Sequence, residues 1–104
     1  MYGTVARYRI KPGMEQKLLD FEREIRGLRM KGFICEFTLR TDEDPDLCYE
    51  IVIFESKEAY RAVGELPGWD ERNRKLMEVL EAEPEWHPGE ILYANQERTP
   101  PNVW

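Results

Sequence analysis

The spacing of apolar residues changes along the chain in a fixed order, and this order limits the possible folds. Residues 2–10, YGTVARYRI, alternate between two sides and end at a Pro-Gly turn, which predicts a strand. From Met14 to Leu28 apolar residues recur every three or four positions, which predicts an amphipathic helix. Residues 33–40 and 47–55 alternate again on either side of the acidic loop TDEDPD, so they predict a hairpin with a solvated turn.

The second half of the chain repeats the change from helix to strand. Ser56 is placed to cap a helix over residues 57–63, and a further helix is predicted from Trp69 to Leu80, after the breaks at Gly64 and Pro67-Gly68. A turn bracketed by two prolines then leads to a final strand at residues 89–94, GEILYA. The order β-α-β-β-α-β predicts a ferredoxin-like α+β domain, with an antiparallel sheet and helices on one face, over residues 1–94. Residues 95–104 are predicted to be a C-terminal tail that ends at Trp104.

Length and charge exclude several classes of partner. A chain of 104 residues suits one domain, and its 21 acidic against 15 basic residues give a net charge of −6. Without a basic block, nucleic acid and anionic membrane are not expected as partners. No apolar run resembles a signal peptide or a membrane span, so we expect a cytoplasmic protein in which Cys35 and Cys48 are reduced core residues.

Side chains alternate across a strand, so each predicted strand offers two faces. The set expected to meet the helices is apolar: Thr4, Ala6, Tyr8 and Ile10, then Phe33, Cys35, Phe37 and Leu39, then Leu47, Tyr49, Ile51 and Ile53. The opposite set mixes apolar residues with charges: Val5, Ile34, Val52 and Phe54 with Arg7, Glu36, Arg40 and Glu50. Such a mixture fits a half-open cavity, which two sheets facing each other in a homodimer would form.

Charged residues on this second face are the first binding candidates. Arg7 is predicted to pair with Glu36 or Glu50 on neighbouring strands. Two interpretations remain open: a structural ion-pair network at the dimer seam, or an arginine that binds the anionic group of a ligand. Asn73 lies four residues after Trp69 on one helical stripe, so it is either a buried, satisfied amide or a substrate contact.

His87 is the only histidine, and it lies between Trp86 and Pro88. A lone histidine lacks the partner that a general base or a metal ligand requires. We therefore predict a structural corner in which Trp86 buries its ring and His87 stays near the surface. Trp69 and Trp86 are interpreted as aromatic residues of the core or of the dimer interface, in preference to a surface on which a substrate stacks.

Three stretches resemble one known family: MYGTVARYRIKPG, GFICEFTLRTDEDPDLCYEIVIFESKEAYRA and VLEAEPEWHPGEIL. Over about residues 2–93 the chain resembles the antibiotic-biosynthesis-monooxygenase-like group of the dimeric α+β barrel superfamily. The resemblance implies a subunit whose sheet packs against that of a second subunit. It also implies a small-molecule pocket between the sheet and its helices or within the barrel, used for cofactor-free oxygenation of phenols or quinols, or for haem degradation.

The haem-degrading relatives use an Asn on the first strand, a Trp in the helix after the third strand, and a His further along. Here the first strand has no Asn, and the other two positions fall near Val63 and near Asn73 or Arg74. Haem binding therefore ranks last, and we expect no cofactor and no metal.

The resulting expectation is a cofactor-independent monooxygenase acting on a phenol- or quinol-type aromatic molecule. The catalytic residue is not identified, and the substrate-binding candidates are Arg7, Glu36, Glu50, Tyr60 and Asn73. The alternative is a non-catalytic small-molecule-binding or structural dimer of the same fold.

Overall fold

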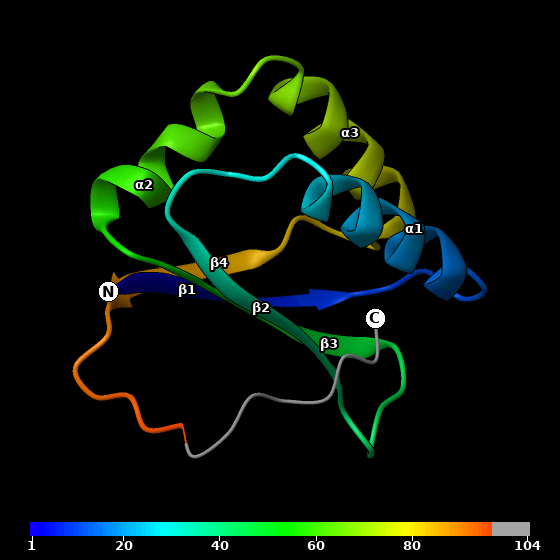
Figure 1. Cartoon of the computed structure of the whole chain (residues 1–104). Helices are drawn as coiled ribbons and strands as arrows, with labels where there is room; N and C mark the ends of the chain where they lie inside the picture. The colour runs from blue at the N-terminus through cyan, green and yellow to red at the C-terminus, as the bar shows by residue number, and fades with distance from the viewer. Residues whose placement is uncertain (97–104) are drawn as a thin grey trace.

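A computed structural model describes residues 1–96 of the chain (Figure 1). The elements follow the order β1 (Tyr2–Arg9), α1 (Glu15–Arg26), β2 (Phe33–Arg40), β3 (Leu47–Phe54), α2 (Lys57–Ala62), a 3₁₀ turn (Val63–Glu65), α3 (Trp69–Val79) and β4 (Glu85–Glu90). The predicted ferredoxin-like order is confirmed, with the second helical segment divided into α2 and α3. The tail was predicted at residues 95–104, and its residues 97–104 lie outside the described part of the chain.

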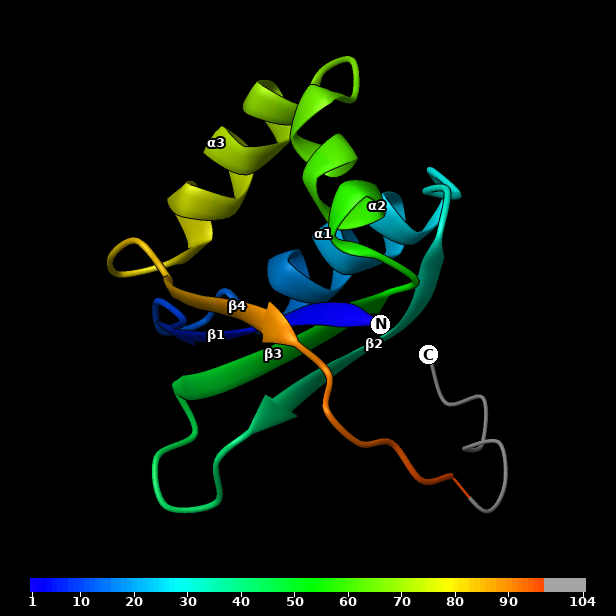
Figure 2. The same cartoon turned by 90° about the vertical axis from the view of Figure 1, so that its left-hand side faces the viewer.

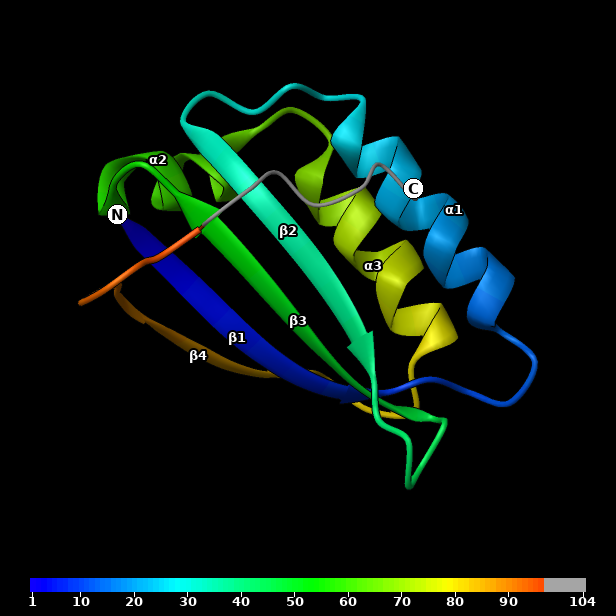
Figure 3. The ribbon, with the colours of Figure 1, turned by 60° about the horizontal axis from the view of Figure 1, so that its bottom comes forward.

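One antiparallel sheet forms the base of the molecule, in the strand order β2-β3-β1-β4. All helices lie on one side of it, as Figures 1 and 2 show. We call the covered side the inner face and the other side the outer face; Figure 3 shows the sheet in front of the helices. Every helix in residues 1–96 is too short or too polar to cross a membrane.

The inner face and the helices enclose the hydrophobic core. Apolar side chains from β1, β3, α1 and α3 meet there, each less than a tenth exposed: Ala6, Tyr8, Ile10, Leu18, Cys48, Leu76, Val79 and Leu80. The predicted contacts of β1 with the helices are therefore confirmed. Burial of this apolar surface is the main term that holds the helices to the sheet.

The predicted faces are wrong for β3 and for β2 from Cys35 onward; Phe33, ahead of a bulge, pairs with the inner-face Phe54 as predicted. Cys48, Glu50, Val52 and Phe54 are the buried residues of β3, and they point to the inner face. In β2, Cys35, Phe37 and Leu39 pair with outer-face positions of β3. Both faces of these strands carry large apolar residues, so alternation alone did not distinguish the two orientations.

The last strand also differs from its prediction. β4 occupies Glu85–Glu90, ahead of the predicted 89–94, and His87 lies opposite Val5 within it. Pro88 pairs with Thr4 inside this strand. Because β4 is at the edge of the sheet, a residue without an N–H is tolerated there, and the proline does not mark a turn.

Two local features fix the start of α2 and the close packing of β1 on β3. Ser56 caps α2 as predicted, because its Oγ accepts a hydrogen bond from the N–H of Ala59 at 3.1 Å. Gly3 lies where β1 approaches β3 closely: a Cβ built on it would be 2.6 Å from the Val52 carbonyl oxygen. Only glycine fits there without a shift of the backbone.

Candidate functional site

A cavity of about 520 Å³ lies between the inner face and the helices. We call it the inner cavity. Its walls come from β1, β2, β3 and β4 below and from α1, α2 and α3 above: Thr4, Phe21, Glu22, Ile25, Met30, Glu36, Glu50, Val52, Phe54, Tyr60, Arg61, Val63, Gly64, Trp69, Asn73, Leu76 and Trp86. Its volume is within the range of about 300–1,000 Å³ that is usual for small-molecule sites.

Three carboxyl groups meet at the wall of this cavity. Glu22 comes from α1, Glu36 from β2 and Glu50 from β3, and one oxygen from each lies within 4.8 Å of the others. We call these residues the carboxyl cluster. Glu50 is 9% exposed, so its carboxyl has little access to water.

The environment of the cluster opposes ionisation. Burial is the main cause that raises the pKa of Glu22, and hydrogen bonding to Glu36 and the charge of Glu50 raise it further. Burial also raises the pKa of Glu50, followed by the charge of Glu36. Two carboxyl groups are thus kept protonated to a higher pH than ordinary glutamates.

Two hydroxyl groups lie beneath the cluster in the floor of the sheet. Tyr8 and Thr4 are 5% and 4% exposed; the Tyr8 hydroxyl interacts with Thr38, whereas Thr4 Oγ1 has no hydrogen-bond partner among residues 1–96. Burial, with the negative charge of Glu50 second, raises the pKa of Tyr8, so its phenol stays neutral. A buried hydroxyl without a partner is costly in a native protein.

Aromatic rings form much of the remaining wall. The rings of Phe54 and Tyr60 meet edge to face with centroids 5.9 Å apart, and Phe33 also meets Phe54 edge to face at 5.7 Å. Phe21, Trp69 and Trp86 add further rings to the lining. These rings provide flat apolar surfaces against which an aromatic ligand can stack.

Of the five predicted binding residues, the structure brings four together. Glu36, Glu50, Tyr60 and Asn73 line the inner cavity. Arg7 does not line it; its Nη1 donates to Glu85 Oε2 at 3.0 Å, and its side chain is 45% exposed.

The predicted pairing of Arg7 with Glu36 or Glu50 is therefore wrong. Arg7 is in register with Tyr49, on the outer face, and both glutamates point to the inner face. The shared face that the prediction assumed does not exist.

The corner residues divide between the two sides of β4. His87 is exposed, as predicted, and its Nε2 lies 3.9 Å from Glu85 Oε1. The predicted burial of Trp86 is wrong: this side chain lines the inner cavity but is 43% exposed.

Sequence reasoning missed Glu22, the third member of the carboxyl cluster. A signal was present, because Glu22 lies four residues after Leu18 and three before Ile25, on the apolar stripe of α1. A charged residue on the buried stripe of a helix is a candidate for function. Thr4 was missed because a threonine in a strand is ordinary.

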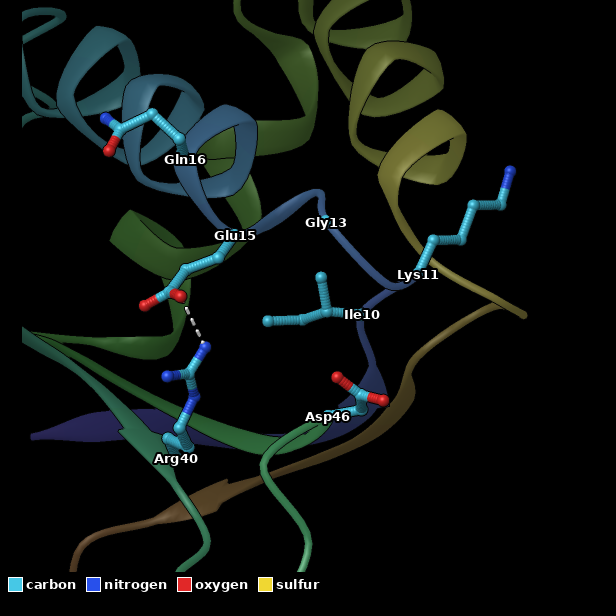
Figure 4. Close-up of a pocket in the computed structure, with 7 residues that line it drawn as sticks. All are labelled: Ile10, Lys11, Gly13, Glu15, Gln16, Arg40 and Asp46. Carbon is cyan, nitrogen blue, oxygen red and sulfur yellow. Dashed lines mark ion pairs between the residues drawn. The ribbon is translucent and has the colours of Figure 1, made fainter.

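A second, smaller pocket of about 360 Å³ lies at the start of α1 (Figure 4). Arg40 Nη2 and Glu15 Oε2 form an ion pair there at 2.7 Å, which fastens the beginning of α1 to β2. The pair raises the pKa of Arg40. Because this lining is mostly polar and its Arg40 is already paired with Glu15, the inner cavity is the better candidate site.

The outer face of the sheet carries a row of apolar residues. Val5, Phe37 and Leu39 are 41%, 39% and 49% exposed. Ile51 lies between Val5 and Phe37 in the pairing register. Within residues 1–96 no helix covers this face (Figure 3). Contiguous exposed apolar surface of this kind marks interaction sites.

Comparisons with known proteins agree with the fold. The family model described as antibiotic biosynthesis monooxygenase matches residues 1–84. SnoaB, a cofactor-independent oxygenase from Streptomyces nogalater, is similar with a TM-score of 0.77 and 16% identity, covering 92% of this chain and 97% of that chain. A candidate antibiotic biosynthesis monooxygenase from Chloroflexus aurantiacus J-10-fl is similar with a TM-score of 0.75 and 21% identity, covering 91% of this chain and 96% of that chain. A conserved protein from Methanosarcina mazei Go1 is similar with a TM-score of 0.74 and 18% identity, covering 85% of this chain and 89% of that chain. Among curated proteins, none matches the chain.

Proposed function

The chain belongs to the antibiotic biosynthesis monooxygenase family, and from this we propose that it is a cofactor-independent monooxygenase. Its substrate is a phenol- or quinol-type aromatic molecule, bound in the inner cavity of each subunit of a homodimer. The similarity in fold to a cofactor-independent oxygenase supports the reaction class. The single observation that carries the proposal is a cavity with aromatic walls and a carboxyl cluster at one side.

The size and lining of the cavity suit an aromatic substrate. A volume of about 520 Å³ accommodates a molecule of two or three fused rings. Phe54, Tyr60 and Trp69 offer their rings for stacking, while Asn73 offers an amide that can bind a substrate oxygen. Polar groups at a few points of an apolar pocket set the orientation of a ligand.

Oxygenation without a cofactor requires the substrate to supply all the electrons. A substrate carbon that carries two hydrogens reacts as R₂CH₂ + O₂ → R₂C=O + H₂O, so one oxygen atom enters the product and the other leaves as water. The first step is loss of a proton, which gives an electron-rich anion that reduces O₂. We assign the proton acceptor to the carboxyl cluster, in which Glu22 or Glu50 in its ionised form is a stronger base than an ordinary glutamate.

Arg7 is not the residue that binds the anionic group of the substrate. Its guanidinium lies on the outer face and pairs with Glu85, so it cannot stabilise a substrate anion in the inner cavity. Arg61 is the cationic residue among the described residues of the lining, and it comes from α2. Stabilisation of a substrate anion is assigned to Asn73 and Tyr60 with Arg61 at the helical side.

The homodimer is proposed on a different residue set from the predicted one. Val52 and Phe54, expected at the interface, are buried against the helices. The outer-face residues Val5 and Leu39 support the proposal in their place. Sedimentation velocity should give a dimer, and Leu39→Asp should shift it to a monomer while Ala82→Asp, a matched change in an exposed loop, should not.

Oxygen uptake tests the catalytic proposal. Quinols, anthrones and flavonols are incubated with the protein and ¹⁸O₂, and the substrate that is consumed should gain one labelled oxygen atom. Asn73→Ala and Glu50→Gln should lower kcat by at least about tenfold. Arg7→Ala, outside the inner cavity, should retain the activity of the parent protein.

The second candidate is a non-catalytic small-molecule-binding dimer of the same fold. The observation that favours it is the protonated state that burial imposes on Glu22 and Glu50, because a protonated carboxyl is not a base. Aromatic ligands that bind in the inner cavity without any oxygen uptake between pH 6 and pH 9 would establish this alternative and exclude the monooxygenase.

A further inference from the structure

The carboxyl cluster brings three acidic groups together, and within residues 1–96 none of them has an ion pair with a basic residue. Oxygens of Glu22, Glu36 and Glu50 lie within 4.8 Å of one another. In water such a group would be held apart by repulsion between like charges, and burial strengthens that repulsion. A protein that places three carboxyl groups in one cavity has a site suited to a cation.

The nearby arginines of the described residues are engaged elsewhere. Arg40 pairs with Glu15 at 2.7 Å, and Arg72 lies 3.7 Å from Glu24. Arg61, from α2, is the only basic residue in the described lining of the inner cavity. The three carboxyl groups therefore exceed the basic charge of the cavity wall.

A second feature of the same cavity also points to a ligand with hydrogen-bond donors. Thr4 lines the inner cavity and is only 4% exposed, and its Oγ1 has no hydrogen-bond partner in the part of the chain that the structure describes. Its strand position is opposite Val52, two residues from Glu50 along β3, so the hydroxyl and the cluster are on one face. The hydroxyl oxygen accepts a hydrogen bond, and so do the carboxyl oxygens once an arriving ammonium group has displaced the protons of Glu22 and Glu50, so an N–H donor would satisfy them.

The rest of the lining distinguishes an organic cation from a bare metal ion. A hard metal ion needs a compact shell of oxygens and water, whereas this cavity measures about 520 Å³ and is mostly apolar. Phe21, Phe54, Tyr60 and Trp69 present aromatic surface. Aromatic rings next to acidic groups suit a molecule that is apolar at one end and cationic at the other.

We propose that the inner cavity binds an aromatic compound that carries a protonated amino group. The ammonium group lies among Glu22, Glu36 and Glu50 and donates to them and to Thr4, while the ring packs against the aromatic wall. The inference rests on the proposed function only in using the inner cavity as the ligand site, and it adds the amino group to the substrate class.

Protonation of the cluster gives this binding a distinctive dependence on pH. The groups that face the ammonium are Glu22 of α1, Glu36 of β2 and Glu50 of β3, with Asn73 and Arg61 in the α3 and α2 walls. The neutral Tyr8 of β1 lies outside the lining and interacts with Glu50 and Glu22. Because burial raises the pKa of Glu22 and Glu50, an arriving cation displaces protons from them. Affinity for an ammonium ligand should therefore rise with pH.

Three probes that share one phenol ring test the charge requirement. Tyramine carries an ammonium group, tyrosol is its neutral alcohol counterpart, and 3-(4-hydroxyphenyl)propanoate is anionic. In NMR and calorimetric titrations in phosphate buffer, tyramine should bind at least about tenfold more tightly than tyrosol. The anion should bind more weakly than tyrosol, and tyramine affinity should rise by about tenfold or more from pH 6 to pH 8.

Variants connect the preference to the cluster. Glu36→Gln and Glu50→Gln should each reduce the ratio of tyramine to tyrosol affinity by at least about fivefold, with tyrosol binding retained. Glu78→Gln, an exposed change on α3, is the matched control and should leave the ratio unchanged. Thermal melts check that each variant is folded.

The outcomes separate this inference from the proposed function. Equal affinity for tyramine and tyrosol, or no tyramine binding at millimolar concentration, overturns the inference, whereas the oxygen-uptake screen with neutral substrates still tests the oxygenase. Tight binding of Mg²⁺, Ca²⁺ or Mn²⁺ that depends on Glu36 and excludes tyramine also overturns it. Selective amine binding without oxygen uptake supports the inference and excludes the proposed oxygenase activity.

Discussion

Replacing Glu50 by glutamine should stabilise the protein, and the gain should depend on pH. Glu50 is 9% exposed, and burial raises its pKa from 4.5 to about 8. Between these two values the folded protein holds a proton on Glu50 that the unfolded chain has released. The folded state therefore binds more protons, and the free energy of unfolding falls as pH rises through this window.

The size of the effect follows from the pKa shift. Each pH unit above 4.5 lowers the free energy of unfolding by about 1.4 kcal/mol for one such proton, which gives about 3 kcal/mol by pH 7. This figure is an upper limit, because water reaches the half-open cavity. Glutamine keeps the shape and hydrogen-bonding capacity of the protonated glutamate without this dependence. Glu50→Gln should therefore equal the parent protein near pH 4.5 and exceed it in stability by as much as about 3 kcal/mol at pH 7.

Chemical and thermal unfolding measure the difference. Both proteins are unfolded at one concentration in acetate and phosphate buffers from pH 4.5 to pH 8, without amines that could occupy the site. A gain of about 1 kcal/mol should raise Tm by about 4–8 °C in a domain of this size. Glu78→Gln, exposed on α3, serves as control and should show no difference that depends on pH.

A constant difference between Glu50→Gln and the parent protein across this range would show that Glu50 is not protonated by burial. A variant less stable than the parent at pH 8 would show that the carboxylate has a stabilising partner. Either result would also remove the physical basis for proton displacement by an ammonium ligand.

Three further changes test other parts of the structure. Gly3→Ala should lower the free energy of unfolding by about 1–3 kcal/mol in chemical denaturation, because its Cβ meets the facing backbone carbonyl, whereas Gly64→Ala has open space and should change it by less than about 1 kcal/mol. Trp86→Ala should cost about 1–2 kcal/mol in the same measurement, less than a fully buried Trp because its side chain is 43% exposed, and His87→Ala should stay within about 0.5 kcal/mol. Arg7→Ala should leave KM and kcat unchanged in any assay found for the inner cavity, and a loss of activity with an unchanged dimer would contradict its placement on the outer face.

The order of elements could be predicted from the sequence because the periodicities are local. The alternation at residues 2–10 and the stripe of α1 from Leu18 to Ile25 are each set by side chains close in sequence. Ser56 was identified as a helix cap for the same reason, since its partner Ala59 is three residues away.

The site was harder to predict because its physics is not local. Glu50 looked like a residue for an open face, and its burial beside Glu22 depends on how α1 packs on the sheet. Placing the more apolar set of side chains against the helices therefore assigned β3 the wrong face, and with it Arg7 the wrong neighbours. Pro88 misled in the same way, since a proline predicts a turn unless the strand is at an edge.

Pro88 also limits how copies of this chain can associate. A proline inside a strand is tolerated where the missing N–H would have pointed away from the neighbouring strand, so the free edge of β4 lacks a donor at that position. Another chain that tried to extend the sheet from β4 would meet an interrupted ladder of hydrogen bonds. Growth of the sheet into a filament is disfavoured at this edge, which agrees with the proposed face-to-face pairing of sheets.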